Sequence, residues 1–368
     1  MARIGIIIYS LSGGGAERMS LNLASEFLAA GHAVDFVLAN DEGELMDQVP
    51  AMSGVYVAPS GGAKSWRAVI RNYTAEKAPD VLLAMMEGAS VISIQAMKKS
   101  KAPVPVVARI PNHFSTHCRE SPRWKERYLM PLAARWHLPA AKLVVAISNG
   151  VREDIISTLG LKRNKVVTIY NPALVTRTIS SSKAHLHSWF DQERKWNVIV
   201  TAGRLTAQKQ QDVLLKSIAL SNMTSDTRLI LLGKGELEIE LRALSRSLGI
   251  EDKVDFVGFV DDPSSYFLQA DIFALSSAWE GFGNVLVEAL AAGAAVVSTD
   301  CPSGPSEILD KGRFGQLVPV GDSEALANAI LRAKAYSVNL ETLTEHLKQF
   351  EGRAVATNYL RVMGLTEL

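Results

Sequence analysis

The sequence predicts an α/β protein made of two doubly wound domains, each with a parallel sheet. Its length of 368 residues suggests two domains of roughly 150 residues. Short apolar runs alternate with amphipathic stretches twice, over residues 4–170 and again from 198 onward. Between these regions lies a polar stretch without periodicity, residues 176–197, which we interpret as a linker. We therefore expect an N-terminal domain over 1–175 and a C-terminal domain over 198–351.

The first half opens with an apolar strand at residues 4–10 and a tight turn at Gly13-Gly14-Gly15. A helix at 16–30 follows, and its apolar side repeats at helical spacing: Leu21, Leu23, Ala24, Phe27 and Leu28. Further strands are expected at 34–38, 81–85, 104–110, 143–147 and 166–170, and further helices at 65–78, 89–100 and 148–158. Asn171-Pro172 ends this half, because a residue before proline is biased away from the helical region.

The second half repeats the alternation. Apolar runs predict strands at 198–202, 229–232, 254–256, 270–276 and 294–299. Helical periodicity predicts helices at 209–221, 236–248, 263–269, 284–292, 323–335 and, as one or two helices, 341–362. Gly293 follows the helix at 284–292 as a C-terminal capping signal.

The composition excludes several classes of protein. The net charge of +1 does not favour nucleic-acid binding by the whole chain. The two cysteines, Cys118 and Cys301, form no disulfide framework and fit a reducing cytosol. No apolar run reaches about 18 residues, so no membrane span is predicted. The apolar start passes directly into Gly13, which favours a buried strand over a signal peptide. We expect a cytoplasmic protein.

Two glutamates frame a strand–loop–helix corner at residues 278–288. Glu280 lies in the loop and Glu288 about one turn inside the helix. Ligands of open parallel sheets bind at the carboxyl ends of the strands. The backbone N–H groups of Asn284, Val285 and Leu286 begin the helix and favour an anion there. The alternative is an ordinary helix start with two solvated glutamates.

Two cations follow another strand of the same half. Arg204 and Lys209 stand five positions apart after the strand at 198–202. Arginine offers a planar fork to a phosphate and lysine a point charge. Together with the helix start at Asn284, they predict a diphosphate site without a metal. Gly14 and Gly15 of the other half allow close backbone approach to the same ligand. The alternative, if these two residues are considered alone, is a pair of cations exposed to solvent.

Residues 98–136 combine cations with aromatic side chains. They hold nine Lys and Arg against two acidic residues, and the aromatic members are Phe114, Trp124, Tyr128 and Trp136. This composition predicts peripheral contact with an anionic membrane, whereas a solvated basic face is the alternative. A nucleic-acid partner is not expected, because no reading helix or RNA-binding motif accompanies the segment.

Four motifs together resemble those of the retaining glycosyltransferases of family GT4. They are Gly13-Gly14-Gly15-Ala16-Glu17-Arg18, Gly203-Arg204-Leu205 with Lys209, Glu280 with Glu288, and Ser303-Gly304-Pro305-Ser306-Glu307. The resemblance implies the GT-B fold, in which two Rossmann-like domains face each other across a cleft. With it we expect the C-terminal helix, about 352–368, to pack back on the first domain.

The resemblance also implies the reaction. A hexose or N-acetylhexosamine moves from a nucleotide sugar, UDP-linked in the favoured case and GDP-linked in the other, with retention at the anomeric carbon. Neither a metal nor another cofactor is implied. The basic aromatic segment and the Gly-Gly-Gly-Ala-Glu-Arg opening favour a lipid-linked saccharide as acceptor, in bacterial polysaccharide or glycan synthesis at the inner face of the membrane.

Site roles are carried over position by position. The resemblance implies that Arg204 and Lys209 contact the donor diphosphate, Glu280 the donor sugar, and Glu288 the ribose hydroxyls. The other donor-binding positions are small residues or backbone amides: Gly14, Gly15, Gly203, Gly258 near the base, Gly283, Asn284, Val285 and Leu286.

One departure from the family concerns a histidine that many relatives carry after the strand at 104–110. Our alignment places Pro111 there. His113 takes that role at the donor sugar, or Asn112 does, or neither; we count His113 among the candidate catalytic residues.

Three alternative functions deserve a test. A sugar-nucleotide epimerase of the same fold would need titrating groups facing the sugar, and the Glu280–Glu288 spacing argues against it. A non-catalytic nucleotide-sugar-binding subunit would not need the complete donor set. A nicotinamide dehydrogenase is disfavoured because Arg18 interrupts the Gly-x-Gly-x-x-Gly spacing.

Overall fold

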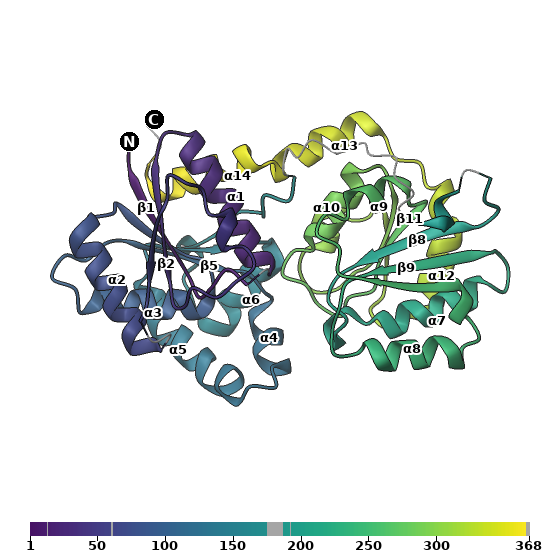
Figure 1. The fold of residues 1–368 in the computed structure, drawn as a ribbon, viewed down its shortest axis with the longest axis horizontal. Coiled ribbons are helices and arrows are strands. Elements are labelled where there is room, and N and C mark those ends of the chain that lie inside the picture. Colours follow the sequence, from purple (N-terminus) through teal and green to yellow (C-terminus); the bar gives the residue numbers. More distant parts are fainter. Residues whose placement is uncertain (13, 60–61, 175–186, 192, 366–368) are drawn as a thin grey trace. The chain divides into compact units, whose positions relative to one another are not determined.

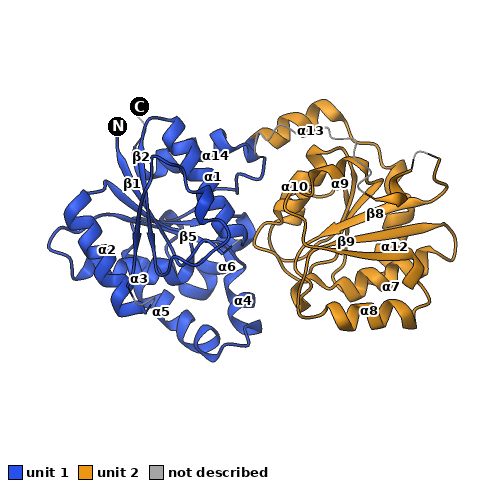
Figure 2. Ribbon diagram, viewed as in Figure 1, with its two compact units in different colours: residues 1–175, 349–368 blue, residues 176–348 orange. Residues whose placement is uncertain are grey.

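The computed structural model describes residues 1–12, 14–59, 62–174, 187–191 and 193–365. The chain forms two compact units, which Figure 2 colours separately: residues 1–175 with 349–368, and residues 176–348. Gly13 of the glycine turn and residues 176–186 of the expected linker lie outside the described residues.

Unit 1 contains a seven-stranded parallel sheet in the order β3-β2-β1-β4-β5-β6-β7 (Figure 1). The strands are β1 Arg3–Ile8, β2 Ala33–Leu38, β3 Gly54–Val57, β4 Val81–Ala84, β5 Val106–Ile110, β6 Leu143–Ala146 and β7 Val166–Thr168. Every pairing is parallel. The chain order reverses between β1 and β4, and open parallel sheets bind ligands beyond the carboxyl ends of the strands at such a position.

The helices of unit 1 cover this sheet. They are α1 Gly15–Ala29, α2 Ala63–Lys77, α3 Glu87–Lys98, α4 Phe114–Glu120, α5 Met130–His137, α6 Asn149–Leu159 and α14 Gly352–Met363. On α1, the side chains of Leu21, Leu23, Ala24 and Phe27 are buried and Leu28 packs against the same core. The apolar side that the sequence predicted for this helix is therefore the side that meets the sheet.

A buried carboxylate ties the edge of this sheet together. Asp35 on β2 is 3% exposed. It accepts hydrogen bonds from Arg3 at 2.7 Å, from the Tyr73 hydroxyl at 3.0 Å and from the amide of Gly54 at 3.0 Å. Burial and the adjacent Asp35 carboxylate raise the pKa of Tyr73, so the phenol remains a donor. The charge is thus satisfied on all sides, which a buried carboxylate requires.

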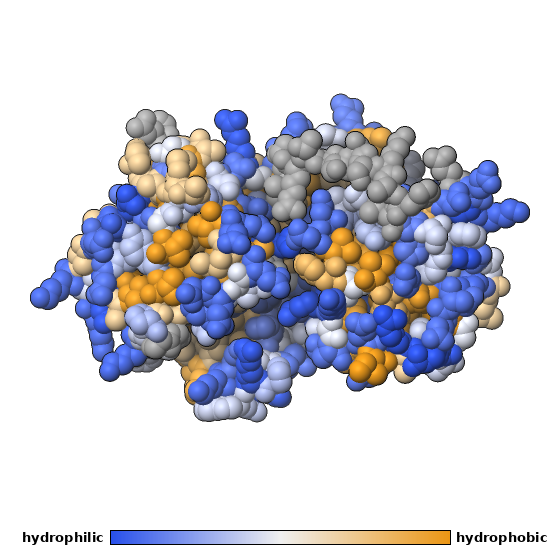
Figure 3. Space-filling model, in the orientation of Figure 1, coloured by the Kyte–Doolittle hydropathy of each residue, from blue (hydrophilic) through white to orange (hydrophobic). Residues whose placement is uncertain are grey.

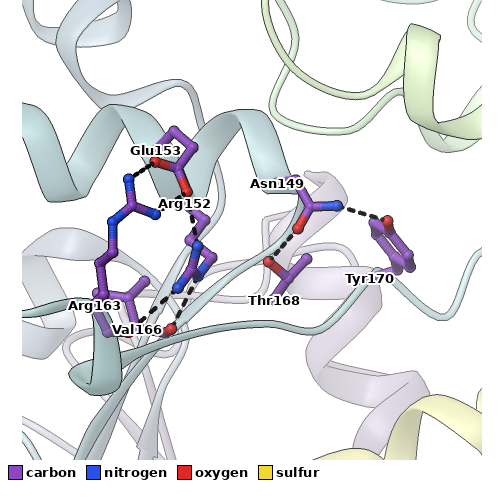
Figure 4. A network of polar contacts seen from close by, with 7 residues as sticks. All are labelled: Asn149, Arg152, Glu153, Arg163, Val166, Thr168 and Tyr170. Atoms are coloured by element: carbon purple, nitrogen blue, oxygen red, sulfur yellow. Dashed lines mark hydrogen bonds and ion pairs between the residues drawn. The ribbon is translucent and has the colours of Figure 1, made fainter. Parts of the chain in front are cut away.

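A polar network fixes the start of α6 to β7 (Figure 4). The side chain of Asn149 accepts a hydrogen bond from Thr168 at 2.8 Å and donates one to the hydroxyl of Tyr170 at 3.1 Å. Arg152 donates from Nε to the carbonyl oxygen of Val166 at 3.1 Å. The side chains of Asn149 and Arg152, which follow β6, are therefore held by hydrogen bonds within unit 1.

The C-terminal helix α14 belongs to unit 1 (Figure 2). Leu174 donates to the carbonyl of Phe350 at 3.0 Å, and the Tyr359 ring on α14 lies 6.5 Å from that of Phe27. The unit boundary falls at Gln349, a few residues before the expected 352, because Phe350 already packs on unit 1: its ring centroid is 5.4 Å from that of Tyr170.

Unit 2 contains a six-stranded sheet in the order β10-β9-β8-β11-β12-β13, again entirely parallel. Its strands are β8 Asn197–Ala202, β9 Thr227–Leu232, β10 Val254–Gly258, β11 Ile272–Leu275, β12 Ala295–Thr299 and β13 Gln316–Val318. Its helices are α7 Gln211–Ser221, α8 Glu238–Ser247, α9 Ser264–Gln269, α10 Asn284–Ala291, α11 Pro305–Ile308, α12 Ser323–Arg332 and α13 Leu340–Leu347.

The predicted fold class, two α/β units with parallel sheets, is confirmed. The strands β3 and β13 and the helices α4, α5 and α11 were not predicted from the sequence. Both strands are edge strands of three or four residues. Such short strands are defined by the neighbour with which they pair rather than by a local pattern.

Candidate functional site

The loop after β11 is bonded to the loop after β8 within unit 2. Ser276 Oγ donates to the carbonyl of Lys209 at 2.8 Å, and the amide of Ala278 donates to the carbonyl of Gln208 at 2.8 Å. The side chain of Gln208 returns a hydrogen bond to the carbonyl of Trp279 at 2.9 Å. The two loops follow neighbouring strands, so the cation motif and the glutamate corner form one structure at the carboxyl edge of the sheet.

A buried ion pair lies at the centre of this structure. Lys209 Nζ contacts Glu280 Oε1 at 2.5 Å, and Ser277 Oγ donates to the same oxygen at 2.6 Å. The Glu280 side chain is only 8% exposed and that of Lys209 17%. Thr299 on β12 in turn donates to the carbonyl of Ser277 at 2.6 Å. A carboxylate at this depth needs both partners, because an unpaired buried charge is costly.

The contact with Glu280 gives Lys209 a structural role. From the sequence, Lys209 is expected to face a diphosphate, whereas in the structure its ammonium group is bonded to Glu280. Lysine has three donor protons, so the group can contact a second acceptor without leaving the first.

The other cation of the motif is in a different environment. Gly203 directly follows β8, and its amide donates to the carbonyl of Leu232 at 2.9 Å. Next to it, Arg204 is exposed, and Gln211 holds its backbone carbonyl at 2.9 Å. In the described part of the chain its guanidinium group has no hydrogen bond or ion pair. The backbone is therefore held while the charged fork remains available at the edge of the sheet.

The N-terminus of α10 only partly meets the expectation. Gly283 caps the helix in the left-handed region at φ 97°, a conformation that favours glycine. The amide of Leu286 donates to the carbonyl of Gly283 at 2.9 Å, so this amide is not available to an anion in the way the sequence analysis expected. Asn284 and Val285 are half-buried at the start of the helix, and their role remains a prediction.

A third loop, after β12, packs against the same corner. The amide of Glu280 donates to the carbonyl of Pro302 at 3.2 Å. Gly304 has φ 95°, and a Cβ atom there would lie 1.8 Å from the carbonyl oxygen of Phe282, so only glycine fits. Ser303 is 8% exposed and adopts φ 71°; no described residue bonds to its buried hydroxyl.

Sequence reasoning missed Ser277, Gln208 and Ser303 as parts of this corner. The Glu280–Glu288 pattern contains none of them. A signal was present only for Ser303, which lies inside the Ser303–Glu307 motif.

The remaining donor-side positions lie on defined elements of unit 2. Glu288 is half-buried in the second turn of α10. Gly258 ends β10 at a register irregularity, and its carbonyl accepts from the amide of Gly233 at 2.7 Å. Their assignments to ribose and base remain predictions.

The candidate residues of unit 1 lie at two strand ends. Gly14 and Gly15 begin α1 after β1. His113 precedes α4 after β5, and its Nδ1 lies 3.6 Å from Asp154 Oδ2, which accepts a hydrogen bond from the amide of Ser115 at 2.9 Å. This His113 nitrogen is buried and has no hydrogen-bond partner among the described residues.

Two members of the basic aromatic segment 98–136 belong to the core, contrary to the prediction of a surface. Arg109 is 1% exposed and donates to the carbonyl of Met85 at 3.1 Å and to Asn171 Oδ1 at 2.7 Å. Phe114 is fully buried. Arg109 lies in β5, a strand that is buried along its whole length, and Phe114 begins the helix α4 that follows it, so both side chains lie inside the unit.

Neither a metal-binding cluster nor a membrane-spanning helix is present among the described residues. They hold no group of three or more His, Cys, Asp and Glu side chains placed to bind a metal ion. No helix among them is both long enough and apolar enough to cross a membrane.

Comparison with sequence families decides the identity of the chain. Residues 13–175 match the family described as Glycosyltransferase Family 4, and residues 188–349 match the one described as Glycosyl transferases group 1. The two matches follow each other along the chain and leave out residues 1–12, 176–187 and 350–368.

The chain belongs to glycosyltransferase family 4.

One similar protein can be aligned with most of the chain. A Campylobacter jejuni protein, N-acetylgalactosamine-N,N'-diacetylbacillosaminyl-diphospho-undecaprenol 4-alpha-N-acetylgalactosaminyltransferase, is 27% identical over 89% of this chain and 88% of its own. The predicted enzyme class, a glycosyltransferase, is confirmed at that level.

Solved structures with the same fold include a galactosyltransferase and a protein in complex with a nucleotide sugar. The lipopolysaccharide outer core galactosyltransferase WaaB superposes with a TM-score of 0.75 at 22% identity, over 98% of this chain and 99% of its own. Anabaena HepE in complex with UDP-glucose gives 0.72 at 24%, over 99% and 97%. The GT-B fold expected from the motifs is thereby confirmed for this family 4 member.

Proposed function

We propose that this family 4 glycosyltransferase transfers a hexose or N-acetylhexosamine from a UDP-sugar, with retention at the anomeric carbon, to a lipid-linked saccharide. The observation that carries the proposal is the buried Lys209–Glu280 pair at the edge of unit 2, next to the exposed Arg204 and the start of α10. A nucleotide sugar suits this arrangement, because the paired carboxylate can accept hydrogen bonds from sugar hydroxyls and the cations can bind the diphosphate.

The donor and acceptor classes are supported by the similar proteins. The Campylobacter jejuni relative is named for transfer of an α-linked N-acetylgalactosamine to a diphospho-undecaprenol saccharide. HepE, with the same fold, was crystallised with UDP-glucose. We extend the two substrate classes to this chain, and GDP-sugars serve as the comparison in the tests.

In the proposed reaction, negative charge develops on the diphosphate as it leaves the donor sugar. The bond between the anomeric carbon and the diphosphate oxygen breaks, and the acceptor oxygen forms its bond on the same face. The leaving diphosphate oxygen takes the acceptor proton, so atoms and charge balance without a separate base. Arg204, Lys209 and the amide dipoles of α10 stabilise the charge that grows on the leaving group.

Within the proposal, Lys209 has two tasks. Its ammonium group holds the Glu280 carboxylate in place, and a remaining proton contacts the diphosphate. Glu280 accepts hydrogen bonds from the hydroxyl groups of the donor sugar. Ser277 shares the carboxylate oxygen with Lys209 and so orients it.

A donor panel tests the nucleotide. UDP, UDP-glucose, UDP-N-acetylgalactosamine, GDP and GDP-mannose are each added in a thermal-shift titration, and a ligand at 100 times its Kd stabilises the folded state by about 2.7 kcal/mol. Stabilisation by the UDP compounds supports the proposal. Stabilisation by the GDP compounds alone would replace UDP with GDP.

Turnover separates an enzyme from a binding subunit. Slow release of UDP from the UDP-sugar without acceptor is expected, and it should become faster when a lipid-diphosphate saccharide is added. Binding of the donor without UDP release under either condition would favour the non-catalytic subunit.

Retention and metal independence need their own measurements. NMR of the first product should show the α-anomeric configuration of the donor. Turnover in excess EDTA should equal turnover in magnesium. A β-linked product contradicts retention, and inactivation by EDTA that magnesium reverses contradicts metal independence.

We also propose that the enzyme works at the membrane face where its acceptor is anchored, and that the segment 98–136 makes this contact. Its surface cations provide attraction to anionic lipid.

A further inference from the structure

An exposed apolar stripe runs along one helical segment of unit 1. The π-helix η2, Lys125–Leu129, continues directly into α5, which Figure 1 draws at the lower edge of this unit. Four large side chains follow each other at intervals of four residues and are strongly exposed: Trp124 at 60%, Tyr128 at 61%, Leu132 at 67% and Trp136 at 78%. Leu129 beside them is 46% exposed.

The opposite side of the same segment holds it in the unit. Ala134 is fully buried, Leu138 is 1% exposed, and the end of the Met130 side chain faces Gly88 at the start of α3. These positions are displaced from the stripe by two residues, which is roughly 200° on a helix. The stripe therefore points away from the core because its opposite face is already packed.

The π-turn aligns the stripe. In a regular α-helix, each step of four residues advances about 40° beyond a full turn, so three steps would spread the four side chains over about 120°. Here the amide of Met130 donates to the carbonyl of Lys125, five residues back. The wider turn rotates the first step the other way and brings Trp124 closer to the line of Leu132 and Trp136.

The sequence accounts for the wide turn. Pro131 stands at the second position of α5. It has no N–H to donate to the carbonyl of Arg127, and its ring would clash with that carbonyl in a regular helix. The five-residue bond of Met130 avoids this clash, so one proline produces the register that collects the apolar side chains.

Cations flank the stripe. Lys125 lies over the ring of Trp124 at 5.9 Å and Arg127 over that of Tyr128 at 5.8 Å, while Arg135 is exposed near Trp136. The single carboxylate of the segment, Glu126, is bonded to Ser121 and Arg123. Figure 3 shows strongly hydrophilic groups beside weakly polar and hydrophobic ones along this lower edge.

We infer that the face formed by Trp124, Tyr128, Leu132 and Trp136 inserts into the interface of an anionic phospholipid leaflet, with the helix lying in the membrane plane. Aromatic rings and leucine then sit at the headgroup boundary, and the flanking cations meet lipid phosphates. Anionic lipid fits better than an apolar protein partner because each aromatic ring is accompanied by a cation. The inference rests on the proposed function and narrows its membrane contact from 98–136 to one helix face.

Vesicle sedimentation of the full chain tests the inference. The wild-type protein is expected to bind vesicles of phosphatidylcholine with phosphatidylglycerol, and binding should weaken as salt rises. The double variant Trp124→Ala/Trp136→Ala should lower the partition coefficient at least about tenfold, since two large apolar side chains are lost. The control Met223→Ala/Ile239→Ala removes two apolar side chains of unit 2 that are even more exposed, at 80% and 79%, and should bind like the wild type.

Two further measurements test the role of the flanking cations and the depth to which the tryptophan side chains insert. Lys125→Gln/Arg127→Gln should weaken binding to anionic vesicles and abolish most of its salt dependence. Brominated lipid should quench the fluorescence of the wild type and much less that of Trp124→Phe/Trp136→Phe. Binding of the alanine double variant equal to that of wild type, or quenching unchanged in the phenylalanine variant, would overturn the inference.

Donor hydrolysis without acceptor is followed in parallel. Absence of vesicle binding with normal hydrolysis overturns this inference and leaves the proposed reaction standing. Stripe-dependent vesicle binding without hydrolysis supports the inference and counts against the reaction. Self-association of the wild type that the alanine variant abolishes, with no vesicle binding, assigns the face to a second copy of the chain and overturns the inference.

Discussion

Replacing Arg204 by alanine should separate catalysis from stability. The guanidinium group is exposed and has no partner among the described residues, so its loss should change the free energy of unfolding by no more than about 0.5 kcal/mol. The backbone of the loop remains held through the carbonyl of Arg204 by Gln211 and through Gly203 by Leu232. The fold and the Lys209–Glu280 ion pair should therefore remain unchanged.

The expected loss of activity is much larger. If Arg204 stabilises charge on the leaving diphosphate, its removal costs about 3 kcal/mol of transition-state stabilisation, or roughly 100-fold in turnover. Lys209→Ala offers the contrast, because Lys209 also holds Glu280, which is 8% exposed. That variant should lose activity and in addition about 3 kcal/mol of stability, since it leaves a buried carboxylate without its cation.

The assay measures UDP release with and without acceptor, alongside urea unfolding of each variant. Arg332→Ala on α12 is the control, an exposed arginine whose guanidinium donates, among the described residues, to the carbonyl of Asn328 alone. It should leave both readouts unchanged. Near-normal turnover of Arg204→Ala would remove Arg204 from the catalytic machinery. A stability loss of several kcal/mol in that variant would show that the guanidinium group is structural, against the present geometry.

Three further outcomes are expected. Glu288→Ala should raise the KM for the donor with little change in kcat, because ribose contacts resemble uniform binding; unchanged donor affinity would contradict its assignment. Asp271 is desolvated, but hydrogen bonds from the Val198 amide, Arg194 and Lys334 outweigh burial and lower its pKa. Its contribution should therefore be complete above the unfolded value of about 3.9 and lost as pH falls through the folded pKa. Asp271→Asn should cost about 2 kcal/mol in urea unfolding at pH 7, and the difference from wild type should shrink toward pH 3; a pH-independent difference would refute the charge argument. Burial, followed by the nearby Glu280, raises the pKa of Cys301 to about 12, so iodoacetamide at pH 8 should label this thiol only after unfolding, and rapid native labelling would contradict its burial.

Much of the fold was determined by local patterns. Buried parallel strands read as continuous apolar runs, as in residues 198–202, and α1 shows its core side through Leu23 and Phe27 at helical spacing. These patterns arise because each element must bury one face or stripe by itself. They hold for the central elements and for the short edge strand β7, but they did not predict the edge strands β3 and β13, which the structure shows through their pairing with a neighbour.

The candidate site divides in the same way. The sequence by itself was enough to propose Arg204, Lys209, Glu280 and Glu288 as candidates, because their residue types and their spacing at strand ends suit a diphosphate and a sugar. It could not determine that Lys209 and Glu280, 71 positions apart, share a hydrogen bond, or that Ser277 completes the pair.

The basic aromatic segment shows why tertiary structure was needed. By composition, Arg109 and Phe114 look like Arg127 and Trp136, yet the first two are buried and the others exposed. The difference comes from β5, which carries Arg109 into the sheet, and from the packing of α5 on α3, which turns Trp136 outward. Residue type and spacing determined what chemistry this chain contains. Only strand pairing and helix packing, which join residues far apart in sequence, decided which side chains meet and which face water.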